Sequence, residues 1–444
     1  MHCVTNIHED LYWLGGSDRQ LAKFENVFPI PRGVSYNAYL VLDEKTVLLD
    51  TVDKAVGERF FENLEFALAG RPLDYVVVNH MEPDHCATLG ELLRRWPGAQ
   101  VVANAKTVPM VSQFFDCDIS NRAVVVKEGD TLCTGRHTFT FLMAPMVHWP
   151  EVMVTYDAAD KVLFSADAFG TFGALNGNIF ADQVDFERDW LDDARRYYTN
   201  IVGKYGAQVQ SLLKRAAGME IQMICPLHGP IWRENLEWFL EKYQRWSTYT
   251  PEDRGVAIFC GSIYGHTENA AEILAARLAE RGVKNIALYD VSHTDVSYLV
   301  SEAFRCSHLV LASATYNGEI YTPMENFLRD LACHGLRGRS VALIENGTWA
   351  ARSGMLMTKL LEEMKEMRVM EGTVTLKSSV KEAQRRGLES LADAIADELL
   401  AMGHEVTVVD DRISMGRGQI IWRGEDGVYT AGTEPRCDGA VAAW

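Results

Sequence analysis

The sequence lacks several features that would place it in a class of protein at once. No apolar run in its 444 residues approaches the roughly 20 needed for a membrane span, so we expect none. The opening residues, MHCVTNIHEDLYW, carry no basic segment and no apolar core, and therefore predict no secretory signal. Paired cysteines are missing as well: nine occur singly and none in a CxxC motif, at positions 3, 86, 117, 133, 225, 260, 306, 333 and 437. This spacing gives no support for a zinc ribbon, an iron–sulfur site or a rubredoxin-type site, and dispersed thiols favour a cytoplasmic location.

Positive charge is also scarce. Lysine and arginine total 43 against 61 acidic residues, and the net charge is −18. This balance argues against nucleic acid or an anionic membrane as a partner. The content of 48% hydrophobic and 23% charged residues is ordinary for a soluble globular protein, and the length predicts two or three domains.

The pattern of elements changes at Pro251-Glu252-Asp253. Before this point, strand-type sequence dominates, with segments at 11–52, 75–79, 100–105, 123–167 and 224–229. Helical spacing is predicted at 56–68, 87–96 and 186–218. We therefore expect residues 1–250 to form one α/β domain of two packed sheets with helices outside them.

Beyond the boundary, strands and helices alternate strictly. Strands are predicted at 256–261, 285–290, 308–313, 340–345 and 373–378, and helices at 268–281, 323–334, 353–367 and 380–402. This order predicts a doubly wound parallel sheet of five strands over residues 254–410, with 405–410 as a further short strand. The Gly-rich extension 411–444 has no assigned role, although QIIWRG and GVYTAG could pair as a hairpin.

The segment 75–85, YVVVNHMEPDH, is the strongest chemical signal in the chain. An apolar strand ends in four potential metal ligands, His80, Glu82, Asp84 and His85. Open α/β sheets place their ligands at the carboxyl ends of strands. Imidazole and carboxylate donors this close together predict a metal site, with more than one ion.

Three further candidate ligands each follow an apolar run: His148, Asp167 and His228. A single histidine or aspartate at a strand end is as often a cap or a hydrogen-bonded core residue as a ligand. Seven such residues, four of them within one hexapeptide, make that explanation weaker for the set as a whole.

A second candidate site begins after the strand 256–261. The loop SIYGHTE leads directly into a helix, whose N-terminus would bind a phosphate. The loop matches neither GxGxxG nor GxxxxGK[ST], so a dinucleotide site and a P-loop are disfavoured. An ordinary capped turn is the alternative. Two later loops, 313–319 and 345–354, offer glycine, asparagine and an aromatic residue at the same edge, where a flat ring could stack. The arrangement resembles flavodoxin and its FMN site.

Taken together, the two halves resemble the flavodiiron proteins, in which a metallo-β-lactamase-like αββα sandwich precedes a flavodoxin-like domain. The resemblance covers about residues 1–405 and includes HxExDH at 80–85, FENVFPIPRGVSYNAYLV, APMVHWPEVM, FSADAFG and CPLHGPIWR. Zinc hydrolases of the same fold carry HxHxDH, and Glu82 replaces the second histidine here. A carboxylate hardens the site and favours iron over zinc.

The resemblance implies a role for each candidate. His80, Glu82 and His148 would bind the first iron, and Asp84, His85 and His228 the second. Asp167 would bridge the two irons, and His85 is the one ligand that varies within the family. Trp149 would line the substrate pocket, while Glu25, Tyr197 and Tyr198 are either pocket residues or packing and surface residues.

The same resemblance implies that three loops hold FMN. The implied cofactor residues are Ser262, Ile263, Tyr264, Gly265, His266, Thr267, Ala314, Thr315, Tyr316, Asn317, Gly318, Asn346, Gly347, Thr348 and Trp349. The family often has SPT where this chain has Ser313-Ala314-Thr315, and a Gly-rich third loop where this chain has Glu345–Trp349. The resemblance therefore does not fix the hydrogen bonds that the third loop makes to the ring.

Electron counting explains why the two modules are fused. A diferrous pair and a reduced FMN together supply four electrons, enough to reduce O2 to two waters, whereas joining two NO into N2O requires two. The resemblance implies an external donor such as rubredoxin, and a head-to-tail homodimer or a tetramer of such dimers. Two alternatives remain: a zinc hydrolase fused to a flavodoxin module, and an electron carrier with a non-catalytic first half.

Overall fold

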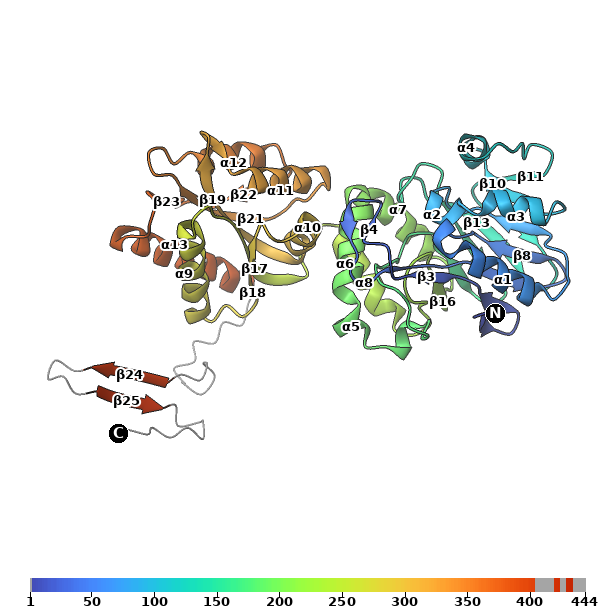
Figure 1. The fold of residues 1–444 in the computed structure, drawn as a ribbon, viewed down its shortest axis with the longest axis horizontal. Coiled ribbons are helices and arrows are strands. Elements are labelled where there is room, and N and C mark those ends of the chain that lie inside the picture. Colours follow the sequence, from blue (N-terminus) through green and yellow to red (C-terminus); the bar gives the residue numbers. More distant parts are fainter. Residues whose placement is uncertain (1, 404–418, 424–428, 434–444) are drawn as a thin grey trace.

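Three larger sheets organise the chain in a computed structural model that describes residues 2–403, 419–423 and 429–433 (Figure 1). The first has seven strands in the order β1-β2-β7-β8-β9-β10-β11. Its bounds are Thr5–His8, Leu11–Trp13, Tyr39–Leu42, Thr46–Leu49, Tyr75–Val77, Gln100–Asn104 and Ala123–Val126. Pairing is antiparallel from β1 to β8 and parallel from β8 to β11. The parallel half places the end of β9 beside the end of β10, where the HxExDH segment begins.

The second sheet has five strands in the order β12-β13-β14-β15-β16. They span Thr131–Cys133, Thr138–Met143, Met153–Asp157, Val162–Phe164 and Met223–Cys225. Only the pair β15 and β16 is parallel. Short ribbons pair β3 (Gly16–Asp18) with β6 (Val34–Tyr36), and β4 (Lys23–Phe24) with β5 (Phe28–Pro29). One continuous apolar core joins both larger sheets.

Helices connect these strands and share that core. The connections within the first sheet contain α1 (Gly57–Leu68), α2 (Pro83–Cys86), α3 (Leu89–Arg95) and α4 (Thr107–Phe114). Helix α7 (Gly206–Ala216) precedes β16 in the chain and α8 (Leu236–Ser247) follows it. The two helices pack against each other. Neither α4 nor α8 was among the helices predicted from the sequence.

The helical stretch predicted over 186–218 is confirmed, but it is not one continuous helix. The segment divides into α5 (Phe186–Asp189), α6 (Leu191–Tyr197), a π-helical turn (Tyr198–Val202), a 3-10 turn (Gly203–Tyr205) and α7. The backbone leaves helical geometry at Tyr205, which has φ −103° and ψ 30°. Gly206 itself is helical, and it lies so close to the Ser247 carbonyl that a Cβ there would be 2.3 Å from it.

The third sheet has the order β18-β17-β19-β21-β22, with β23 also paired to β21. Its strands span Ile286–Asp290, Asp253–Gly261, Cys306–Tyr316, Ser340–Asn346, Arg368–Val369 and Val374–Leu376, and the short β20 (Glu319–Ile320) pairs with β19. This is the predicted doubly wound parallel sheet, in the 2-1-3-4-5 order of flavodoxin. The fifth position is shared by β22 and β23, and β22 was not predicted.

Helices cover both faces of the third sheet. Residues of α9 (His266–Glu280) and α13 (Glu382–Ala401) share one apolar cluster, and residues of α10 (Val296–Arg305), α11 (Thr322–Cys333) and α12 (Ser353–Glu362) share another. Helix α10 is absent from the sequence-based prediction, which moved directly from the second strand to the third. Its N-cap Asp295 and buried Leu299, Val300, Ala303 and Phe304 carry a clear helical pattern.

Helix α10 of the C-terminal part packs against α6 of the N-terminal part (Figure 1). Arg196 of α6 lies between the rings of Phe172 and Tyr298, with its Cζ 4.6 and 4.1 Å from their centroids, and it donates to Ser297 over 3.0 Å. Arg339 donates to the Tyr249 carbonyl over 2.7 Å. Tyr249 and Arg339 lie just before β17 and β21, so this second contact is at the amino edge of the third sheet.

Two further strands, β24 (Gln419–Arg423) and β25 (Tyr429–Thr433), pair antiparallel, as the sequence predicted for QIIWRG and GVYTAG. The strand predicted at 405–410 lies outside the described residues. No helix in the described ranges is long and apolar enough to cross a membrane.

A buried histidine joins several loops at the end of the sandwich away from the HxExDH segment. His137 is 0% exposed; its Nδ1 lies 2.7 Å from Asp157 Oδ2 and its Nε2 3.1 Å from Asp10 Oδ2. Arg136 pairs with Asp10 and Asp160, and Asp43 accepts the His137 backbone N–H. Burial would lower the pKa of His137, but the two aspartates raise it to about 9.

This network predicts a loss of stability at alkaline pH. Because the folded pKa lies above the unfolded value of 6.5, the stabilisation is complete below about pH 6.5 and disappears as pH rises through about 9. The shift corresponds to at most about 3 kcal/mol. Urea unfolding of the wild type should therefore become easier between pH 6.5 and 9, while the His137→Gln variant should lack this step. A step of equal size in both proteins would show that His137 does not carry it.

Candidate metal centre

Seven potential ligands converge at the carboxyl ends of strands from the first two sheets. His80 and Glu82 follow β9, Asp84 and His85 lie on α2, and His148, Asp167 and His228 follow β13, β15 and β16. They form two clusters, one of His80, Glu82, His148 and Asp167, the other of Asp84, His85 and His228. The sequence predicted all seven, and the structure brings all seven together.

Asp167 lies between the two clusters and directs one oxygen to each. Its Oδ2 is 3.3 Å from His80 Nε2 and 3.0 Å from His148 Nε2. Its Oδ1 is 3.1 Å from His85 Nε2 and 3.8 Å from His228 Nε2. Its neighbours Ala166 and Phe169 have left-handed backbone conformations, with φ of +51° and +68°. These turns carry a tightly constrained backbone of the kind often found at functional sites.

The remaining carboxylates complete each cluster. Glu82 Oε2 is 3.1 Å from His80 Nε2 and 3.0 Å from His148 Nε2. Asp84 Oδ2 is 3.3 Å from His85 Nε2 and 3.2 Å from His228 Nε2. Each cluster thus has two inward-facing imidazoles and one carboxylate of its own, and shares Asp167. This donor set, rich in hard oxygen, suits iron.

The electrostatics of the clusters favour positive charge. Burial would lower the pKa of His148, but the Asp167 and Glu82 carboxylates raise it to about 9. Burial would raise the pKa of Asp167, but the imidazoles of His80 and His85 hold it well below its ordinary value.

Several inward-facing atoms have no hydrogen-bond partner within the described part of the chain. Asp84 Oδ1 and Oδ2, Asp167 Oδ1 and His148 Nε2 are all buried and unsatisfied. Buried polar atoms are seldom left so, because each costs free energy. Two cations placed between the clusters would satisfy them, so the residues present fit a binuclear metal centre.

Outer contacts that the sequence did not reveal hold the ligands in place. Asp50 accepts from the backbone N–H of Asn79 (2.7 Å) and His80 (3.2 Å) and from the Asn79 side chain (2.8 Å). Glu151 Oε1 lies 2.9 Å from His80 Nδ1, and His228 Nδ1 lies 2.7 Å from the Ser35 carbonyl. Asp50 is a carboxylate directly after the apolar strand β8, and this position is the one signal in the sequence that could have identified it.

The four predicted pocket residues differ in position. The Trp149 ring packs edge-on against His80, with centroids 5.4 Å apart, and the Tyr197 ring lies 5.4 Å from His228. Glu25 is exposed as a whole residue, but its carboxyl comes near enough to the first cluster for loss of hydration and the Glu82 carboxylate to raise its pKa to about 8. Tyr198 instead packs against Tyr243 and Trp246, away from the ligands.

The predicted flavin residues lie together at the carboxyl edge of the third sheet. The first loop follows β17 and runs into the first turn of α9, at residues 262–267. The second covers the end of β19 and the turn after it, at 314–318, and the third begins at the last residue of β21, at 346–349. The register pairs Gly261 with Ser313 and Ala314 with Asn346, so the three loops begin side by side. The rings of Tyr264, Tyr316 and Trp349 are 88%, 48% and 94% exposed at this edge.

An anion site is built where α9 begins. No side chain caps this helix, and its N-cap Gly265 has φ +83°. Thr267 is buried, and its hydroxyl accepts from Asn346 Nδ2 over 3.1 Å, which leaves the hydroxyl proton free to donate. Asn346 also exchanges hydrogen bonds with the backbone of Ser378, a residue of a fourth loop that sequence reasoning missed. An uncapped helix N-terminus beside exposed aromatic rings fits a phosphorylated flavin.

The second and third loops are also tied together. Thr315 Oγ1 accepts from the backbone N–H of Arg352 (2.9 Å) and Ser353 (3.1 Å), at the start of α12. The turn Asn317-Gly318 has φ of +51° and +81°, which favours asparagine and glycine. The loops are thus ordered by the protein itself.

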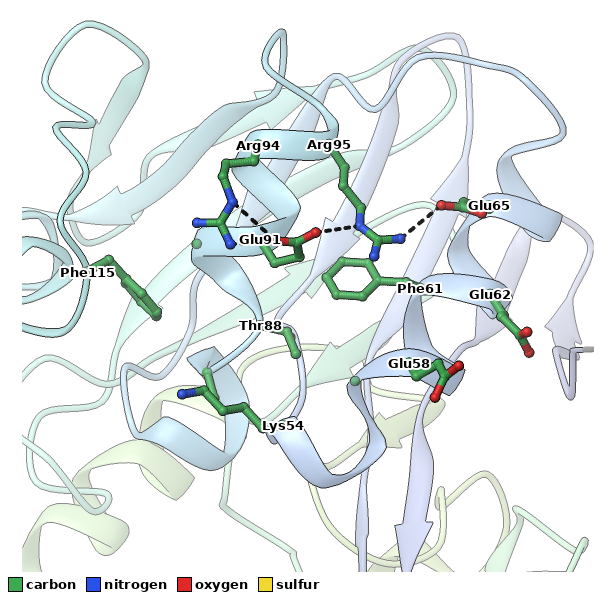
Figure 2. A pocket seen from close by; sticks show the side chains of 13 residues that line it. Lys54, Glu58, Phe61, Glu62, Glu65, Thr88, Glu91, Arg94, Arg95 and Phe115 are labelled. Atoms are coloured by element: carbon green, nitrogen blue, oxygen red, sulfur yellow. Dashed lines mark hydrogen bonds and ion pairs between the residues drawn. The ribbon is translucent and has the colours of Figure 1, made fainter.

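A separate hollow of about 740 Å³ opens between α1 and α3 (Figure 2). Figure 2 shows part of its charged rim paired: Glu91 bonds Arg94 and Arg95, and Arg95 also reaches Glu65. The lining of the hollow contains none of the seven candidate ligands and none of the predicted flavin residues.

Comparison with known proteins places these features in context. Residues 34–229 match the family model described as ODP family beta lactamase. The anaerobic nitric oxide reductase flavorubredoxin of Aliivibrio fischeri is 31% identical over 342 residues, which is 76% of this chain and 68% of that protein. An uncharacterized protein of Methanocaldococcus jannaschii is 30% identical over 332 residues, or 74% of this chain and 82% of that protein.

Solved structures agree in fold over nearly the whole chain. The rubredoxin oxygen:oxidoreductase of Desulfovibrio gigas superposes with a TM-score of 0.83 and 28% identity, covering 90% of this chain and 100% of that one. The flavodiiron protein of Giardia intestinalis has a TM-score of 0.84 and covers 90% of this chain and 98% of that one; at 24% identity it supports the fold alone. The predicted β-lactamase-like sandwich followed by a flavodoxin-like sheet is confirmed.

Proposed function

This chain belongs to the flavodiiron protein family and is an oxidoreductase, and we propose that it reduces O2 to water, NO to N2O, or both. The observation that carries the proposal is the position of Asp167, whose two oxygens face two separate sets of ligands. Two metals bound this close together can hold one small molecule between them. The zinc hydrolase alternative is not favoured, because Glu82 replaces the imidazole that zinc enzymes of this fold use.

We assign the ligands as two sets with a shared bridge. His80, Glu82 and His148 would hold one iron, Asp84, His85 and His228 the other, and Asp167 both. When bound, a diferrous pair would supply two electrons and reduced FMN two more. That total balances O2 plus four electrons and four protons to two waters, and two NO plus two electrons and two protons to N2O and water.

The protein's own residues would shape the pocket. Trp149 packs on His80 and limits access to the centre. The Tyr197 hydroxyl is buried and bonds no described residue, so it is free to donate to an oxygen atom of a small ligand. Residues 1–250 would form the diiron domain, residues 254–410 the FMN domain, and 411–444 an extension without an assigned role.

The FMN of one chain would serve the diiron site of another. The contact between Tyr249 and Arg339 lies at the amino edge of the third sheet, whereas the predicted FMN loops lie at its carboxyl edge. Between the two edges β19 runs for 11 residues, which at about 3.3 Å each is about 36 Å. This separation supports a head-to-tail homodimer, alone or paired into a tetramer, in which each FMN faces the partner's metal centre.

The electrons would come from outside the chain. The 444 residues hold no CxxC motif, so no rubredoxin-type iron site lies within them. We propose rubredoxin or a similar small protein as the donor, in the cytoplasm, where the free thiols seen throughout the described residues would persist.

Gas consumption by the anaerobically reduced protein tests the proposal. O2 and NO are offered separately under one electron donor. Loss of O2 with water as product, or of NO with N2O as product, supports it, and the faster gas identifies the main substrate. The Glu82→Ala variant should keep its flavin and lose this turnover. Consumption of neither gas by protein that contains iron and FMN would overturn the proposal.

A further inference from the structure

The four imidazoles of the metal centre differ in what lies on their outer nitrogens. His80 Nδ1 faces a carboxylate, Glu151 Oε1, at 2.9 Å. His228 Nδ1 faces only a neutral carbonyl, that of Ser35, at 2.7 Å. His85 Nδ1 is buried and bonds nothing in the described chain, and no described residue is hydrogen-bonded to the outer nitrogen of His148.

Without Glu151 the two clusters would be matched in charge. Each has one carboxylate of its own, Glu82 or Asp84, and both share Asp167. Each also has two histidines that face inward through Nε2. The ligands themselves therefore give no reason for one metal to differ from the other. The carboxylate of Glu151, which contacts His80 of the first cluster, makes the charges around the two metal positions unequal.

Glu151 is placed to exert its charge fully. It is 1% exposed, and its Oε1 also accepts the Met81 backbone N–H over 3.0 Å. Its Oε2 is buried with no hydrogen bond to any described residue. The Glu151 carboxylate is buried and forms no ion pair with a lysine or arginine in the described chain. Its charge therefore acts strongly on His80, because water does not screen it.

We propose that Glu151 makes the two metal positions unequal, so that the His80 position binds its iron more tightly and holds it in the higher oxidation state. A carboxylate that accepts from Nδ1 makes the imidazole a stronger donor through Nε2. The His85 and His228 position lacks such a partner and would lose its iron first and be reduced first. The inference rests on the proposed diiron function.

The test uses the full-length, iron-loaded protein and the Glu151→Gln variant. Glutamine keeps the shape and an oxygen that can accept from His80, but it has no charge. The matched control is Asp157→Asn, which removes the buried carboxylate on His137 in the same sandwich but touches no candidate ligand. Two quantities are measured: the rates at which a chelator removes the two irons, and the midpoint potentials of the diiron pair.

In the wild type we expect two distinct rates and two separated potentials. Outer-shell changes typically cost about 10–100-fold in metal affinity, so Glu151→Gln should speed the slower iron loss about tenfold or more, toward the faster rate. The equilibrium constant for forming the half-reduced pair from the fully oxidised and fully reduced pairs should fall about tenfold, equivalent to about 59 mV in the separation of one-electron potentials. Asp157→Asn should change neither quantity.

Unchanged rates and potentials in Glu151→Gln would overturn the inference, as would equal acceleration of both irons. If that variant does not fold, Glu151→Asp, which keeps the charge but draws it away from His80, should move both quantities in the same direction by a smaller amount. A wild type that binds zinc or no metal would instead contradict the proposed function, so the two failures can be told apart.

Discussion

Replacing Asp167 by asparagine will abolish gas reduction and reduce bound iron to one ion or none per chain. The side chain keeps its size but loses its charge, and its amide nitrogen is a poor metal ligand. Asparagine keeps only one side-chain oxygen, so at most one cluster retains its contact, since Oδ1 and Oδ2 each face a different set of imidazoles. The loss of turnover should exceed the 10–100-fold that removal of an outer contact typically costs.

Iron analysis, flavin absorbance and turnover check this expectation together. FMN content should stay at the wild-type level, because the flavin loops lie in the other sheet. Asp157→Asn, a buried carboxylate that contacts His137 and none of the seven ligands, should keep both irons. Two irons per chain and wild-type turnover in Asp167→Asn would show that this residue is not the bridge.

Four of the metal ligands, His80, His148, Asp167 and His228, could be predicted because each follows an apolar strand within a few residues. The other three, Glu82, Asp84 and His85, could be predicted because they share one hexapeptide with His80. The outer contacts could not be predicted in the same way. Glu151 meets His80 across 71 positions, and Ser35 meets His228 across 193, with no motif to join them.

The fold shows a similar division. Buried parallel strands such as β17, β19 and β21 read as apolar runs bounded by polar loops, and they were predicted closely. Helix α10 was overlooked despite its amphipathic pattern, and the division of the helical stretch 186–218 at Tyr205 was not predicted. Local pattern therefore identified most elements better than it identified their ends.

A mixture of two inactive variants should recover activity if electrons pass between chains. Asp167→Asn removes the metal centre and keeps FMN. Thr267→Asp keeps the metal centre and places a carboxylate in the buried anion site at the start of α9, where it should repel the FMN phosphate. In a head-to-tail mixed dimer, the FMN of the first variant faces the metal centre of the second.

The expected recovery is about a quarter of the wild-type rate per chain, because random pairing makes half of the dimers mixed and each has one working site of two. Two different affinity tags on the two variants would verify that mixed dimers form, and each variant alone provides the baseline. Electron transfer within one chain would give no recovery, since every chain lacks one of the two centres. Mixed dimers without activity would therefore contradict electron transfer from the FMN of one chain to the metal centre of its partner.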